Sequence, residues 1–346
     1  MPEPPRSDDR PKVLLLACGG TIASVASPTA GAIPRLSAED LTVELRAGMP
    51  KLRLEARTFS MIASSQMTLD EVLRLYREIV LCIDADPRIR GVVVTHGTDT
   101  LEEVAFALDL LWDRPMPIVV TGAMRNPTVL SPDGMANIAG AVATAQSSSA
   151  QGLGVLVVLN DEIHAARFVR KGHPSNLSTF ESPTVGRIGH ISEGTPRVLL
   201  SPRSRASLRV IPTGVEASPV ALHKVTIGDD GRSLRHILPD GYRGLVIEAL
   251  GGGHVTPAIN ESDAFAEILR TVPVVMSTRS GTGEPLRSTY AFAGSETYLL
   301  ARGVMSSGVL DGPKARVLLT LLLAAGASRT EIADAFIVHG MQPREA

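Results

Sequence analysis

Four apolar runs rich in β-branched residues recur in the first half of the chain. They are Lys12–Ala17, Gly91–Thr95, Ile118–Thr121 and Gly154–Leu159. Successive positions within each run are apolar, so both faces of each strand require burial. This pattern favours a parallel sheet covered by helices on both sides over a half-exposed antiparallel sheet.

Amphipathic segments separate these strands. Thr68 is followed three residues later by Glu71, which is a capping-box pattern, and apolar residues then recur at helical spacing. Thr100 and Glu103 repeat the pattern, and we expect a third, Ala-rich helix to begin at Asp133. Strand–helix–strand repetition predicts right-handed crossovers, with ligands bound at the carboxyl ends of the strands.

A change in composition and periodicity divides the chain into two predicted domains. Residues 201–218 are rich in Pro, Ser and Arg with weak periodicity, and we interpret them as a linker. Residues 12–200 are expected to form a larger, Rossmann-like parallel-sheet domain, and residues 219–346 a smaller α/β domain. In the smaller domain the strands are expected at 220–227, 244–250 and 272–277, and the helices at 261–271, 314–325 and 329–338. Residues 1–11 are interpreted as a disordered tail.

Composition excludes several classes of partner. The 346 residues include 34 Lys and Arg against 36 Asp and Glu, without the basic excess of a nucleic-acid-binding domain. Two cysteines, Cys18 and Cys82, are too few for a disulfide framework or a structural zinc site, and we expect Cys18 to be buried. The sequence shows no signal peptide and no run long enough to cross a bilayer, so we expect a cytoplasmic protein without a membrane partner.

The first strand leads into Cys18-Gly19-Gly20-Thr21-Ile22-Ala23. The two glycines permit a tight turn with exposed backbone N–H groups, where an oxyanion could be held beside the Thr21 hydroxyl. The alternative interpretation is a plain turn with a capping threonine. The segment lacks GxGxxG and GK[ST], so a nucleotide site is remote.

The second strand leads into Thr95-His96-Gly97-Thr98-Asp99-Thr100. Hydroxyls, an imidazole and a carboxylate gather at one strand-to-helix junction, where Thr98 or Asp99 could orient a nucleophile, a water or a substrate amine. The alternative is helix capping by one of these residues, and we interpret His96 as a structural hydrogen-bonder.

Two further loops carry polar candidates. Asn160–Lys171 follows the fourth strand, and a lysine drawn into a crevice beside a carboxylate can relay protons. The alternative for Lys171 is a surface position. Ser64 and Ser65 precede a helix, where adjacent hydroxyls can hold a carboxylate or simply cap. Thr, Lys and Asp together suit nucleophilic acyl transfer without a metal or organic cofactor.

These motifs resemble the bacterial-type L-asparaginase/glutaminase family. GGTIAS, THGTDTLEE, VTGAMR and the segment around Lys171 carry the resemblance, which extends from about Lys12 to Gly340. The resemblance implies a two-domain α/β fold and a homotetramer built as a dimer of dimers. It also implies active sites between the N-terminal domain of one subunit and the C-terminal domain of its partner.

The resemblance also implies roles for individual residues. Thr21 matches the nucleophile, and Thr98, Asp99 and Lys171 match the groups that manage protons, with Asp99 also holding the substrate α-amino group. Ser64 matches the serine that binds the α-carboxylate. The remaining residues implied to bind substrate are Gly20, Ser65, Gly97, Ala123, His254 and Glu296, the last from the partner subunit.

The chain departs from the family pattern at three places. Residues 24–37 contain no tyrosine, although many members carry one in this mobile loop, hydrogen-bonded to the nucleophile. Either another group activates Thr21, or Tyr290 or Tyr298 of a neighbour does, or the enzyme is slow. Ser65 replaces a glutamine, and His254 stands where others carry asparagine.

The implied function is hydrolysis of L-asparagine to L-aspartate and ammonia through a threonyl acyl-enzyme. A preference for L-glutamine or a related amide is the first alternative, since one methylene changes binding by only about 1–3 kcal/mol. The second is an amino-acid-binding protein that has lost catalysis.

Overall fold

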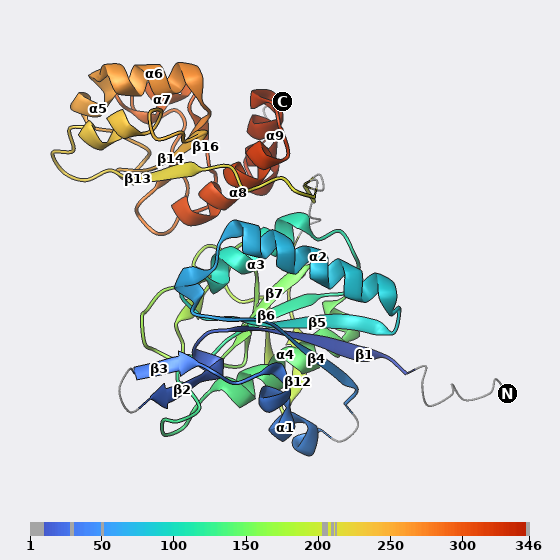
Figure 1. Cartoon of the computed structure of the whole chain (residues 1–346). Helices are drawn as coiled ribbons and strands as arrows, with labels where there is room; N and C mark the ends of the chain where they lie inside the picture. Colours follow the sequence, from blue (N-terminus) through green and yellow to red (C-terminus); the bar gives the residue numbers. More distant parts are fainter. Residues whose placement is uncertain are drawn as a thin grey trace. The chain divides into compact units, whose positions relative to one another are not determined.

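The computed structural model describes residues 10–27, 31–49, 52–202, 207, 208, 211 and 213–343. Within them the chain forms two compact units that meet in sequence between Ser207 and Leu208 (Figure 1). This boundary falls inside the segment interpreted as a linker, much of which lies outside the described residues, as does most of the predicted tail.

The first unit contains an eight-stranded sheet in the order β12-β11-β8-β7-β6-β5-β1-β4. Its parallel part comprises β1 (Lys12–Gly19), β4 (Leu54–Ile62), β5 (Ile89–Thr95), β6 (Ile118–Thr121) and β7 (Val155–Leu159). Three antiparallel strands extend the sheet beyond β7, namely β8 (Glu162–Ala165), β11 (Gly189–Ser192) and β12 (Thr195–Val198).

The strand order determines where a ligand site is expected. The chain starts in β1, moves outward to β4 and then returns to the other side of β1 as β5. The direction of winding therefore reverses between β1 and β5, and loops diverge there at the carboxyl ends of the strands. Doubly wound sheets bind ligands at this kind of switch point.

Helices cover both faces of this sheet. α1 (Ala38–Gly48) and α4 (Gly134–Gln146) pack on one face, and α2 (Leu69–Ala85) and α3 (Leu101–Leu111) on the other (Figure 1). Val13, Leu15 and Ala17 share a core cluster with residues of α1 and α4, while Leu14 and Leu16 alternate with them and are equally buried. The predicted burial of both strand faces is confirmed.

One of the two predicted capping boxes is wrong. Thr68 accepts the N–H of Glu71 at 3.2 Å and caps α2, which confirms this half of the box, and the Glu71 carboxylate pairs with Arg74. Thr100 occupies the N-cap position of α3 but makes no capping bond, because its hydroxyl is used by His96 and by the carbonyl of Ser64.

Shorter elements complete the first unit. They are η1 (Thr21–Ala23), β2 (Ser24–Ser27), β3 (Gly31–Pro34), η2 (Ser64–Gln66), η3 (Ser148–Ala150), β9 (Arg170–Lys171) and β10 (Phe180–Glu181). β2 and β3 form an antiparallel hairpin directly after η1, and β9 pairs with β10.

The second unit is built on a four-stranded parallel sheet in the order β13-β14-β15-β16. The strands are β13 (Val220–Lys224), β14 (Gly244–Ala249), β15 (Val274–Thr278) and β16 (Met305–Ser306). The helices are η4 (Arg232–His236), α5 (Pro257–Glu261), α6 (Asp263–Thr271), α7 (Glu296–Ala301), α8 (Gly312–Ala324) and α9 (Arg329–His339). Together with the first unit, this confirms the predicted α/β class with a larger and a smaller parallel sheet. Among the described helices, none is both long and apolar enough to cross a membrane.

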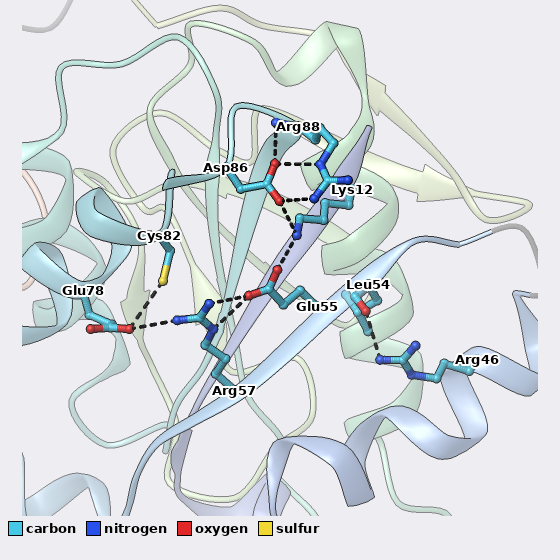
Figure 2. A network of polar contacts seen from close by, with 9 residues as sticks. All are labelled: Lys12, Arg46, Leu54, Glu55, Arg57, Glu78, Cys82, Asp86 and Arg88. Atoms are coloured by element: carbon cyan, nitrogen blue, oxygen red, sulfur yellow. Dashed lines mark hydrogen bonds and ion pairs between the residues drawn. The ribbon is translucent and has the colours of Figure 1, made fainter. Parts of the chain in front are cut away.

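A charged network ties the amino ends of the central strands together. Lys12, the first residue of β1, pairs with Glu55 of β4 and lies 2.6 Å from Asp86, which precedes β5 (Figure 2). The Arg88 guanidinium donates two bonds of 2.8 and 2.7 Å to the same Asp86 carboxylate. Arg88, with help from Lys12, holds the pKa of Asp86 well below its usual range. The network lies at the sheet edge opposite the β1–β5 switch point.

Candidate active site

The glycine turn after β1 touches the loop after β5 through backbone atoms alone. Gly19 and Gly20 have φ of 85° and 79°, which favour glycine. A Cβ on Gly20 would lie 2.3 Å from both N and Cα of Gly97, so a side chain there is excluded. The next residue, Thr21, begins η1 and is partly exposed. The two predicted loops therefore meet at the switch point.

Ser64, which follows β4, lies against the same contact. A Cβ on Gly97 would lie 2.7 Å from the Ser64 Oγ, and the Ser64 side chain is buried. Ser65 is exposed. The structure thus brings Gly20, Gly97 and Ser64 together, and Ser64 rather than Ser65 lines the contact.

His96 has a structural position. It is fully buried, and its Nε2 lies 2.9 Å from the Thr100 Oγ1. Thr100 in turn donates to the carbonyl of Ser64 at 3.0 Å, so the His96 Nε2 must carry the hydrogen of the bond to Thr100. Burial lowers the pKa of His96 to about 4. His96 thus makes a structural hydrogen bond, as the sequence interpretation expected, and Thr100 makes the link to the loop of Ser64.

Lys171, the last residue of β9, contacts the loop that follows β5. Its Nζ donates to Thr98 Oγ1 at 2.9 Å and lies 2.6 Å from Asp99 Oδ1. Thr98 is buried, and the Lys171 side chain is 14% exposed, whereas the Asp99 side chain is 69% exposed. A partly buried amino group therefore lies between a hydroxyl and an accessible carboxylate, a set of groups that can transfer protons.

The Asn160–Lys171 segment contributes less to the site than expected. Asn160 and Asp161 have φ of 50° and 59° and form the two-residue turn between antiparallel strands β7 and β8. A polar pair between two apolar runs is the sequence signal for such a hairpin. Of this segment, Lys171 is the residue that contacts Thr98 and Asp99.

Ala123 offers only backbone to a ligand. It is fully buried in the loop after β6. Asp133 fixes this loop by accepting the N–H of Met124 at 3.0 Å and of Arg125 at 2.8 Å. A Cβ on Gly134 would meet side-chain atoms of both Ile22 and Ala123 within 3.5 Å, so this loop runs beside the Thr21 segment.

His254 and Glu296 pair with each other in the second unit. His254 Nε2 lies 3.1 Å from Glu296 Oε2, while Oε1 of Glu296 accepts the N–H groups of Thr289 at 2.8 Å and Tyr290 at 2.7 Å. Burial would raise the pKa of Glu296, but these backbone donors and His254 give a net lowering, which favours the carboxylate.

That Glu296 binds substrate stays a prediction for the assembled protein. Within one chain the residue is fully buried, and both of its oxygens accept hydrogen bonds. It orients His254, which is partly exposed and packs edge-on against Tyr290 and Phe292 with ring centroids 5.0 and 5.1 Å away. The sequence analysis did not identify Phe292, because an isolated aromatic residue carries no motif.

The described residues present no metal site: no three His, Cys, Asp or Glu side chains among them gather to hold an ion. The chemical groups of the first unit are a threonine hydroxyl beside a glycine turn and a Thr–Lys–Asp cluster.

Known families and proteins match this chain over almost its whole length. The family described as "Asparaginase, N-terminal" matches residues 12–203, and "Glutaminase/Asparaginase C-terminal domain" matches residues 219–336. An L-asparaginase of Bacillus licheniformis is 34% identical over 321 residues, covering 91% of this chain and 96% of its own.

Two further relatives differ in the compartment that their names give. A "Probable L-asparaginase periplasmic" of Haemophilus influenzae is 33% identical over 326 residues, covering 91% of this chain and 89% of its own. The crystal structure of a "Probable Cytoplasmic L-asparaginase" from Campylobacter jejuni superimposes with a TM-score of 0.83 at 29% identity. The match covers 95% of this chain and 100% of that one.

Proposed function

Because this chain belongs to the asparaginase family, we propose that it hydrolyses L-asparagine to L-aspartate and ammonia with Thr21 as its nucleophile. The observation that carries the proposal is the meeting of two loops at the β1–β5 switch point. There the turn before Thr21 touches Gly97, next to the Thr98–Lys171–Asp99 cluster.

The first half of the reaction forms an ester. The Thr21 Oγ1 attacks the side-chain amide carbon, and its hydroxyl proton passes to Thr98 while Thr98 transfers its own proton to the lone pair of the Lys171 amine. Backbone N–H groups near Gly20 and Ala123 stabilise the oxyanion. The C–N bond then breaks, and the leaving nitrogen takes a proton to depart as ammonia.

The second half hydrolyses this ester. Water attacks the aspartyl carbonyl carbon and gives up a proton to the same pair. The C–O bond to Thr21 breaks, the hydroxyl regains its proton, and L-aspartate leaves. No tyrosine lies in residues 24–37, so in this proposal activation of Thr21 rests on Thr98 and Lys171.

Two groups are suited to the ends of the substrate. The accessible Asp99 carboxylate suits the α-ammonium group, and Ser64, which contacts Gly97, suits the α-carboxylate. Exposed Ser65 lies one residue further along the loop and would contact substrate only at the rim.

We also propose the homotetramer, a dimer of dimers in which the second unit of one copy covers the site of another. His254 with exposed Tyr290 and Phe292 would then form the covering surface. Light scattering after size exclusion measures this state directly. For the compartment we retain the cytoplasmic prediction, although the named relatives include a periplasmic protein.

Ammonia release tests the function. L-asparagine, D-asparagine and L-glutamine are supplied in parallel to wild type and to Thr21→Ala. We expect release from L-asparagine, with a loss of about 10⁴ to 10⁶ in rate in the variant. Faster release from L-glutamine would favour a glutaminase. A folded protein that releases no ammonia, but whose melting temperature rises with L-asparagine, would indicate a binding protein.

A further inference from the structure

Lys171 reaches the Thr98–Asp99 loop from a very short strand. β9 contains only Arg170 and Lys171, and its one strand partner, β10, contains only Phe180 and Glu181. An isolated pair of two-residue strands is at best marginally stable, so it cannot by itself fix the position of a long lysine side chain. The placement of the Lys171 Nζ therefore depends on what holds β9 against the loop after β5.

The hairpin leaves the backbone N–H of Lys171 pointing away from β10. Gly172 donates across the hairpin to the carbonyl of Thr179 at 2.7 Å. In an antiparallel pair, the N–H of the neighbouring residue points to the opposite side. There the N–H of Lys171 donates to the Glu102 Oε2.

Glu102 lies in the first turn of α3, three residues after Asp99. The helix dipole favours a carboxylate in this position and strengthens the hydrogen bonds that it accepts. Residues 98–102 thus bind Lys171 at both its backbone and the tip of its side chain. Thr98 and Asp99 bind its Nζ, and Glu102 binds its backbone.

We infer that Glu102 is a positioning residue for Lys171 in the amide hydrolysis, an inference that rests on the proposed function. Glu102, in the first turn of α3, fixes the starting point of the lysine side chain relative to the preceding loop, which carries Thr98 and Asp99. Its effect on the reaction is exerted through Lys171.

Two variants of Glu102 separate the effect of its acceptor oxygen from the effect of its charge, and a third variant is the control. Glu102→Ala removes the acceptor, and Glu102→Gln keeps an acceptor oxygen without the charge. Glu39→Ala is the matched control, an exposed glutamate in the first turn of α1. We expect kcat for L-asparagine to fall about tenfold to a hundredfold in Glu102→Ala with a smaller change in KM. Glu102→Gln should recover most of the loss, and Glu39→Ala should match wild type.

A double variant tests whether Glu102 acts through Lys171. In Lys171→Met, the loss caused by Glu102→Ala should disappear, so that the double variant is no slower than Lys171→Met alone. Losses that multiply would overturn the inference, because Glu102 would then act independently of the lysine. Equal kcat in Glu102→Ala and wild type would overturn it as well.

Hydrogen exchange provides a readout that needs no activity. The peptide that contains residues 168–175 should exchange its amides faster in Glu102→Ala than in wild type or Glu39→Ala, while peptides of β1 and β5 stay unchanged. Unchanged exchange at 168–175 would contradict a positioning role for the Lys171–Glu102 hydrogen bond, even if the protein hydrolysed a different amide. Faster exchange in a protein that releases no ammonia from L-asparagine would support the positioning role of the Lys171–Glu102 hydrogen bond and reject the proposed function.

Discussion

The Lys171 Nζ lies 2.6 Å from the Asp99 Oδ1, although 72 residues of sequence separate the two side chains. The same Nζ donates to the Thr98 Oγ1, so the lysine is bound to both residues that follow Gly97. The Lys171 side chain is largely shielded from solvent, while its carboxylate partner stays accessible. This asymmetry leaves Asp99 available to a ligand without releasing the lysine.

Replacement of Lys171 should therefore affect turnover far more than folding. We expect Lys171→Met to lower kcat by about 10² to 10⁴, the usual contribution of a proton-transferring group. Lys224→Met is the control, because Lys224 is 60% exposed and pairs with Glu248 in the second unit. Ammonia release and thermal unfolding are measured for both. Comparable activities in the two variants would reject a catalytic role for Lys171.

The glycine contact between the two loops gives a second prediction. Gly20→Ala would place a Cβ 2.3 Å from Gly97 backbone atoms at a φ of 79°, so we expect loss of activity and of several kcal/mol of stability, about the scale of severe overpacking. Gly152→Ala is the matched control, with a φ of 76° and no atom within 4 Å. It should cost only about 1–2 kcal/mol, the strain of a left-handed residue, and leave kcat unchanged. An active Gly20→Ala variant would show that the loops can separate.

The parallel strands of the core were predictable because a strand buried on both faces consists of a continuous apolar run. β4 was not identified, because only Leu54 of its nine residues is buried and no apolar run marks the strand. Its Glu55 and Arg57 are polar and join the charged network of Figure 2. α1 was missed for a related reason: four of its eleven residues are buried and the rest face solvent.

The site could be predicted as residue types at strand ends, but not as contacts. Nothing local in the sequence indicates that Thr100 bonds to His96 instead of capping α3, or that Glu102 accepts the Lys171 N–H. The Thr100 hydroxyl is oriented by the Ser64 carbonyl 36 residues earlier, and Glu102 and Lys171 are 69 residues apart. The pairing of Glu296 with His254 was hidden for the same reason, since 42 residues separate them.

The charged network at the amino ends of the strands should contribute to stability and not to turnover. Lys12 pairs with two carboxylates and is 16% exposed, so Lys12→Met should lower the free energy of unfolding by about 1.5–3 kcal/mol with kcat unchanged. Arg232→Met is the control, because Arg232 is 81% exposed and pairs with Asp230, an ion pair worth about 0–1 kcal/mol. Urea unfolding of both variants checks the difference. A fall in kcat for Lys12→Met would instead couple this edge of the sheet to the site.

His96 should make the first unit sensitive to acid. Burial lowers its pKa to about 4 from 6.5, so between these values the unfolded chain binds more protons than the folded one. Stability from the neutral ring is therefore complete above pH 6.5 and is lost as pH falls toward 4, by about 1.4 kcal/mol per pH unit. His96→Gln cannot titrate, so the stability advantage of wild type over this variant should shrink with that slope. Urea unfolding of both proteins between pH 7 and pH 4.5 measures the slope. A constant difference across the range would mean that His96 is not buried as the neutral ring.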